Sequence, residues 1–321
     1  MHSTIVKKTF LFLSLFLVVT LVACDVSVMV APSTSPAPLS TNIMLQASVT
    51  PIQATVAPTQ IPASVTPIPA TAAPSPTPTT LQPSFEGVEV SSGPLSVVLP
   101  PGLTYGARGS QIARAEGPNV AAWDITPGHT QLKLEGYFLQ GKSQQPQIYV
   151  YPAQAYAEMV PAAFESMHRL NNILFDPAAQ ISGEQLPRVP FFNNTQVFAS
   201  NIQLISFQNG RGVRFLTEYA QYAASANNHD LFYHFQGVTG DGAYYVVAIL
   251  PITAPMLAET SDGGAVLPDG GVPYSYFADP GADMQLYYRS VLDLLNASPS
   301  QIFTPNMDQL DALIQSIRII P

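Results

Sequence analysis

The chain contains a single cysteine, Cys24, which directly follows its most apolar segment. A thiol can form a disulfide, act as a nucleophile or carry a lipid, and its surroundings decide among these chemistries. An intramolecular disulfide needs a second cysteine, which the chain lacks. The segment before Cys24 therefore has to indicate what the thiol does.

The residues before Cys24 have the three parts of a secretory signal peptide. Two lysines form a basic start, an apolar run extends from Phe10 to Ala23, and Ala23 is small. The run is shorter than the roughly 20 residues that span a membrane. We therefore expect residues 1–23 to be a signal peptide. A single transmembrane anchor with an incidental cysteine is the alternative.

The stretch "LVAC", residues 21–24, resembles the lipobox of bacterial lipoproteins. This resemblance implies that Cys24 receives a diacylglycerol, that cleavage occurs before it, and that the new amino terminus can be acylated. Two or three acyl chains anchor a protein stably, whereas one anchors it weakly. The expectation is an extracytoplasmic protein that is lipid-anchored to the bacterial cell membrane through Cys24. The resemblance ends at residue 24, and the rest of the chain resembles no family by its motifs.

A second group of candidate residues lies in a segment of about 30 residues, 253–283, that lacks helix and strand patterns. It contains three aromatic residues close together, Tyr274, Tyr276 and Phe277, and several carboxylates without a basic residue. Aromatic rings on a loop can stack on a sugar or peptide. Asp262 and Asp269 are weak candidates for calcium, because their spacing does not match a calcium-binding loop. The plain alternative is a solvated loop whose rings pack on the domain.

Local catalytic motifs are absent from the sequence. It has no G-x-S-x-G elbow, no H-E-x-x-H, and no glycine-rich loop that opens a helix, so no cofactor is indicated. His229 and His234 would point to opposite faces of one strand and cannot share a metal. Paired carboxylates of a glycosidase leave no local signature, because the fold sets their spacing. A non-catalytic binding or accessory module is favoured, and an envelope hydrolase acting on glycan or peptide is the alternative.

The charge of the chain limits its partners. Removing residues 1–23 would take away two lysines and change the formal charge from −9 to −11. A negative, lysine-poor protein is a poor ligand for nucleic acid or anionic lipid, whose phosphates demand basic residues. We expect no nucleic-acid partner, membrane attachment through the lipid alone, and cell-wall glycan or peptide as possible ligands.

Residues 24–85 have the composition of a linker. From Val26 to Phe85 the chain has no charged residue and is rich in Pro, Thr, Ser and Ala, with a tandem repeat at 47–62 and 63–78. Proline fixes φ and removes backbone donors, so neither a helix nor a central strand can propagate there. We expect a disordered, semi-rigid tether that holds the following domain away from the membrane.

The remaining residues, 86–321, are enough for one globular domain. Four apolar-rich runs at 195–207, 213–222, 231–239 and 243–251 are separated by turn residues, including Asn209-Gly210. An Asn-Gly pair between such runs predicts a hairpin, and the series predicts an antiparallel meander over about 195–251. The alternation of apolar and polar residues over 213–220 predicts a sheet with one covered face and one wetter face.

Helices are predicted to pack against this sheet. Apolar spacing predicts one helix over 153–174, beginning or kinking at Pro161, and another over 283–295. A third should begin with Thr304 as its N-cap, and 318–321 should form a short edge strand. Additional strands are expected at 95–100, 120–125, 131–139 and 147–152. The expected fold class is α+β, loosely similar to an α/β/α sandwich.

Overall fold

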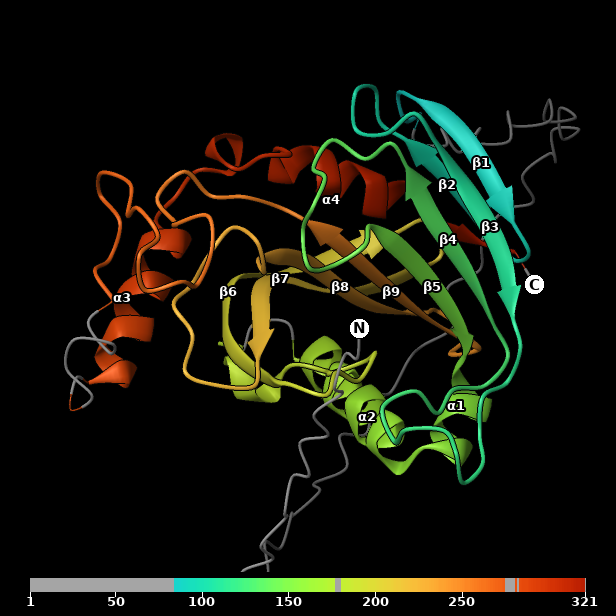
Figure 1. Ribbon diagram of the computed structural model, residues 1–321. Coiled ribbons are helices and arrows are strands. Elements are labelled where there is room, and N and C mark those ends of the chain that lie inside the picture. The colour runs from blue at the N-terminus through green and yellow to red at the C-terminus, as the bar shows by residue number, and fades with distance from the viewer. Residues whose placement is uncertain (1–83, 177–179, 275–280, 282, 321) are drawn as a thin grey trace, which may run out of the picture. The chain divides into compact units, whose positions relative to one another are not determined.

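A computed structural model of the protein describes residues 84–176, 180–274, 281 and 283–320. Residues 24–83 of the predicted tether, with Cys24, lie outside the described residues, as do Tyr276 and Phe277. Within the described ranges, two antiparallel sheets and four α-helices form the α+β fold that the sequence predicts (Figure 1).

The larger sheet is antiparallel throughout. Most of its neighbouring strands are consecutive in the sequence, but β5 pairs with β9. In spatial order its seven strands are β3 (Gly106–Ile112), β4 (His129–Glu135), β5 (Gln147–Pro152), β9 (Tyr244–Pro251), β8 (Phe232–Thr239), β7 (Gly210–Ala220) and β6 (Thr195–Phe207). The smaller sheet has the order β1 (Val88–Ser92), β2 (Leu95–Leu99) and β10 (Arg318–Ile319). The predicted edge strand near the C-terminus is therefore confirmed as β10.

The predicted meander is confirmed as strands β6 to β9, each paired with the next. The first hairpin closes with Phe207 opposite Gly210. A Cβ atom at Gly210 would lie 2.5 Å from the carbonyl oxygen of Val238, so only glycine fits this turn. The Asn-Gly pair thus predicted the hairpin correctly, and the close approach of the Val238 carbonyl oxygen explains why glycine is needed there.

Both faces of the sheet are buried, so the prediction of one wetter face is wrong. Along β7, Val213 and Phe215 lie in one hydrophobic cluster, while Leu216 lies in the cluster on the opposite face. The polar residues Arg214 and Glu218, which suggested a wet face, are themselves buried. Their burial is possible because helices cover both faces of the sheet (Figure 1).

Two helices cover one face. The predicted helix over 153–174 is two helices, α1 (Ala153–Met159) and α2 (Pro161–Phe175), with Val160 in extended conformation between them. Proline has no backbone N–H to donate and is tolerated at the first helical position, so α2 begins at Pro161. Phe164 is one of the apolar residues whose three- and four-residue spacing predicted a helix over 153–174, yet its side chain is exposed.

The other face is covered by α4 (Met307–Ser316) and the smaller sheet, with the short 3₁₀ helix η2 (Ser300–Ile302) before α4. Asn306 caps α4 by accepting a hydrogen bond from the Asp308 N–H at 2.8 Å, so the prediction of Thr304 as the cap is wrong. Thr304 instead exchanges two backbone hydrogen bonds with Thr253. This extended pairing holds Thr304 outside the helix.

Helix α3 (Met284–Asn296) lies beside the edge strand β6 (Figure 1). Its predicted start is confirmed, because the Asp283 carboxylate accepts hydrogen bonds from the Gln285 and Leu286 N–H groups. The 120–125 segment is a turn rather than the predicted strand. Strand β8 begins at Phe232, so His229 lies in the preceding loop and the predicted opposition of His229 and His234 on one strand does not apply.

Candidate functional site

The segment after β9 packs against the loop between β7 and β8. The Asn228 N–H donates to the Ala258 carbonyl at 2.8 Å, and the His229 N–H donates to the Glu259 carbonyl at 2.9 Å. The Asn228 side chain donates to the Leu257 carbonyl and accepts from the Ala254 N–H. Two irregular segments are thus tied together mainly through buried backbone groups, which fixes them without a helix or strand.

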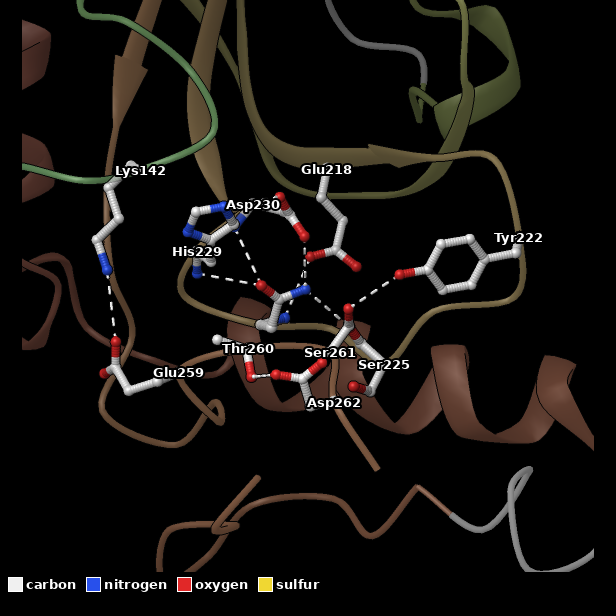
Figure 2. A network of polar contacts seen from close by, with 11 residues as sticks. Lys142, Glu218, Tyr222, Ser225, His229, Asp230, Glu259, Thr260, Ser261 and Asp262 are labelled. Carbon is white, nitrogen blue, oxygen red and sulfur yellow. Dashed lines mark hydrogen bonds and ion pairs between the residues drawn. The ribbon is translucent and has the colours of Figure 1, made fainter. Parts of the chain in front are cut away.

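Asn227 organises the β7–β8 loop through side-chain contacts to Ser225, His229 and Asp230, which are labelled in Figure 2. Its amide oxygen accepts from the His229 and Asp230 N–H groups, and its amide nitrogen donates to the Ser225 carbonyl and the Asp230 carboxylate. Every one of these distances is 3.0 or 3.1 Å, and Asn227 is fully buried. An asparagine in a turn often bonds its own neighbouring backbone in this way.

Glu218 lies behind this loop, at the end of β7, and is fully buried. Its Oε2 accepts a hydrogen bond from the Asn227 N–H at 3.1 Å, whereas its Oε1 has no hydrogen-bond partner. Burial raises the pKa of the Glu218 carboxyl well above its usual range, and the nearby Asp230 carboxylate adds to this effect. Burial therefore favours the protonated, neutral form of the Glu218 carboxyl group.

A cavity of about 310 Å³ opens between the two segments and α3. The residues that matter most for its chemistry are Ser225, Ala226, Asp262, Leu267, Tyr274 and Tyr287. The rings of Tyr274 and Tyr287 meet edge to face, with centroids 4.9 Å apart. This is the arrangement that aromatic quadrupoles prefer, and it fixes both rings at the cavity wall.

Both tyrosine hydroxyls are engaged in the wall itself. The Tyr274 hydroxyl donates to the Ala223 carbonyl, and the Tyr287 hydroxyl accepts from the Ala226 N–H at 3.0 Å. Burial raises the pKa of Tyr287 to about 12, so its hydroxyl stays neutral. The rings are therefore held by their hydroxyl ends, and the cavity offers ring surface together with the exposed Asp262 carboxylate.

The carboxylates of the long segment have separate roles. Asp262 accepts from the Thr260 hydroxyl at 2.8 Å, Glu259 pairs with Lys142 at 3.4 Å, and Asp283 caps α3. Asp269 is exposed and does not line the cavity. Throughout the described ranges, no group of three or more His, Cys, Asp or Glu side chains is placed to hold a metal. The structure therefore does not bring Asp262 and Asp269 together as calcium ligands.

The histidines are dispersed. His234 is buried and bonds the Val189 carbonyl through Nε2, while His229 is half exposed. His129 packs against Tyr151 with ring centroids 4.5 Å apart. These environments are those of packed or surface side chains rather than of a shared site.

Of the three aromatic residues predicted to bind a ligand, Tyr274 lies at the cavity, and Tyr276 and Phe277 lie outside the described residues. The sequence analysis missed Glu218, Asn227, Asn228 and Tyr287. The "ANNHD" stretch was a usable signal, because two consecutive asparagines in a loop can each anchor the backbone. Glu218 gave no such signal, because it occupies an ordinary position in a strand.

None of the helices within the described residues is both long and apolar enough to cross a membrane. Comparison with known proteins finds no matching family model, no matching curated protein and no matching solved structure.

Proposed function

We propose that the protein is an extracytoplasmic lipoprotein that displays a non-catalytic, glycan-binding domain on a tether. The lipobox-like residues 21–24 and the uncharged linker support the anchored location. The observation that carries the binding function is the cavity with Tyr274 and Tyr287 in its wall and Asp262 at its rim.

The chemistry of this cavity suits a sugar from the cell wall. Carbohydrates present apolar C–H faces, which pack on aromatic rings. Their hydroxyl groups donate hydrogen bonds that a carboxylate accepts. Leu267 adds apolar surface, and Asp262 supplies the acceptor. A volume of about 310 Å³ is at the lower end of the usual range for small-molecule sites, so it suits a single sugar unit of a longer chain.

Hydrolysis fits the same cavity less well. A glycosidase places two carboxyl groups on either side of the scissile bond. Among the described residues that line the cavity, Asp262 is the single carboxylate. Glu218 is a carboxyl group whose protonated form burial favours, as a proton donor requires, but it is fully buried and does not line the cavity. Binding without chemistry is therefore the better-supported function.

The test is calorimetric titration of the full chain with soluble peptidoglycan fragments. Asp262→Asn should weaken binding at least tenfold, because it removes the charged acceptor at the rim. Asp269→Asn is the matched control, since it makes the same change on the same segment outside the cavity. Equal affinities for the two variants would refute binding in this cavity, and release of reducing ends from the glycan would assign hydrolysis instead.

A further inference from the structure

Two arginines from separate parts of the chain border one groove, which has a volume of about 590 Å³. Arg188 follows the 3₁₀ helix η1 (Gly183–Gln185), Arg289 lies on α3, and both side chains are exposed. Neither forms an ion pair with any carboxylate that the structure describes, whereas three other arginines do. Because Glu184 is the one carboxylate among the described residues that line the groove, the groove carries a net positive charge in a chain of formal charge −9.

The backbone on either side of Arg188 is held by a buried glutamine of β8. The Gln236 side chain donates to the Pro187 carbonyl at 2.8 Å and accepts from the Val189 N–H at 3.1 Å. The Arg188 N–H itself donates to the Ser166 hydroxyl of α2 at 3.2 Å. A surface arginine whose backbone is fixed in this way loses less conformational entropy when it binds a ligand.

The opposite wall of the groove, formed by α3, is also fixed near both of its ends. The Tyr288 hydroxyl donates to the Ala224 carbonyl at 2.8 Å. At the other end of the helix, the Asn201 side chain donates to the Leu295 carbonyl at 3.0 Å. Arg289 therefore projects from a helix whose position against the sheet is set by contacts on each side of it.

The floor of the groove is β6, which is irregular there. Its pairing with β7 shifts register between Gln196 and Phe198. In addition, η1 lies against the strand, because a Cβ atom at Gly183 would be 3.4 Å from the Ala199 Cβ atom. A ligand in the groove therefore meets side chains of β6 rather than a regular row of backbone hydrogen-bonding groups.

The side chains in the groove suit an acidic sugar. The half-buried Tyr288 ring and Leu292 form an apolar wall on which the C–H face of a sugar can pack. Ser182, Gln196 and Gln285 supply hydroxyl and amide groups that form hydrogen bonds with sugar hydroxyls. Guanidinium groups bind carboxylates in bidentate geometry. The volume of about 590 Å³ lies within the usual range for small-molecule sites.

From these observations we infer that the groove binds a sugar unit that carries a carboxylate, with Arg188 and Arg289 holding the carboxylate and Tyr288 packing on the sugar ring. The groove is separate from the tyrosine-lined cavity, and the inference does not rest on the function proposed for that cavity. The two sites differ in charge, because the cavity presents the Asp262 carboxylate, which repels an acidic sugar, whereas the groove attracts it.

The test measures fluorescence anisotropy of a labelled short oligomer of glucuronic acid, titrated with the full chain. The corresponding glucose oligomer lacks the carboxylates, and polyglutamate lacks the sugar rings. The glucuronic acid oligomer should bind, and each of the other two should bind roughly tenfold more weakly or worse. Equal binding of the glucose oligomer would overturn the role of the arginines. Equal binding of polyglutamate or polyphosphate would overturn recognition of a sugar.

The protein variants locate the site. Arg188→Gln with Arg289→Gln should reduce affinity for the glucuronic acid oligomer by roughly tenfold or more, because it removes both carboxylate-binding groups. The control pair Arg211→Gln with Arg318→Gln makes the same charge change away from the groove. Both pairs replace exposed side chains, so their circular dichroism spectra should match that of the parent. Equal affinities for the two double variants would overturn the inference.

Discussion

The Glu218 carboxyl group and the Asn227 backbone form the contact on which the β7–β8 loop rests. Glu218 Oε2 accepts from the Asn227 N–H at 3.1 Å, while Oε1 is buried without a hydrogen-bond partner. A backbone N–H is satisfied by this contact, but one oxygen of the acid is not. The loop beside the tyrosine-lined cavity is therefore supported by a group whose ionisation the fold opposes.

Replacing this acid should change how stability depends on pH. The folded pKa of Glu218 is raised, so its contribution is fully present below the unfolded pKa and is lost as pH rises. Between that unfolded value and the folded pKa, the loss is about 1.4 kcal/mol per pH unit. Glu218→Gln, which cannot ionise, should be more stable than the parent at pH 8 and lose this slope. Urea unfolding across pH measures it.

The control for this experiment is Glu259→Gln, which replaces an exposed carboxylate on the neighbouring segment. Its stability curve should run parallel to that of the parent protein. If Glu218→Gln instead lowers stability at every pH without changing the slope, the acid is ionised in the folded protein and our assignment of its charge is wrong.

His234 should produce the opposite dependence. Burial lowers its pKa to about 3, so it is neutral in the folded protein at pH values where the unfolded chain binds a proton. Its contribution is fully present above pH 6.5 and is lost as pH falls toward 3, by about 2 kcal/mol at pH 5. His234→Gln should remove this acid sensitivity, whereas the control His168→Gln changes an exposed ring and should retain it. Equal acid slopes for the two variants would contradict the prediction.

Asn227 should be the most sensitive residue of the β7–β8 loop. Asn227→Ala removes four side-chain hydrogen bonds and takes away the partner of the Asp230 N–H and of the Ser225 carbonyl, whereas the His229 N–H keeps the Glu259 carbonyl. We expect a loss of about 2–4 kcal/mol in the free energy of unfolding, since each unsatisfied buried group costs roughly 1–3 kcal/mol. Asn171→Ala, on the exposed face of α2, is the control. A loss below that of the control would show that the loop does not depend on Asn227.

Local sequence patterns predicted where turns, strands and helices lie. They predicted less well which side chains of these elements are buried. The Asn209-Gly210 hairpin and the α3 cap at Asp283 depend on neighbouring residues, which sequence spacing reveals. The burial of Arg214 does not depend on neighbouring residues. It depends on an ion pair with Asp311 of α4, with the two side-chain atoms 3.3 Å apart. A polar strand residue that finds its partner on a distant helix looks like a solvent-facing residue in the sequence. For this reason the second covered face was missed.

The candidate site likewise combines features that the local sequence revealed with features that depend on long-range contacts. The length and composition of the 253–283 segment predicted that Tyr274 could border a site, and Tyr274 lines a cavity. Tyr287 lies within the helix predicted over 283–295 and was not singled out, because its role depends on the Ala226 N–H from another part of the chain. Glu218 depends on burial by the loop that follows it. These contacts are long-range, and spacing within one segment cannot reveal them.

The linker should contribute nothing to the stability of the domain. Residues 26–83 lack the apolar content needed to offset the entropy of ordering them. A chain that begins at Pro83 should therefore unfold within about 2 °C of the chain that begins at Cys24. As a contrast, a chain that begins at Leu95 also loses β1, which pairs with β2 along its length, and should melt at a lower temperature. Calorimetry of the three chains compares them directly. A large loss on removing residues 24–82 would place the domain boundary earlier in the chain.

The last prediction concerns the anchor. If Cys24 carries the lipid, Cys24→Ala should abolish incorporation of a radiolabelled fatty acid and leave the protein either as an uncleaved precursor or free of the membrane. A mass measurement of the parent protein should show residues 1–23 removed and acyl chains added. The transmembrane alternative gives opposite results, because residues 1–23 would be retained, no label would be incorporated, and Cys24→Ala would remain in the membrane. Lys133→Ala, a distant single substitution, controls for expression and should be labelled like the parent.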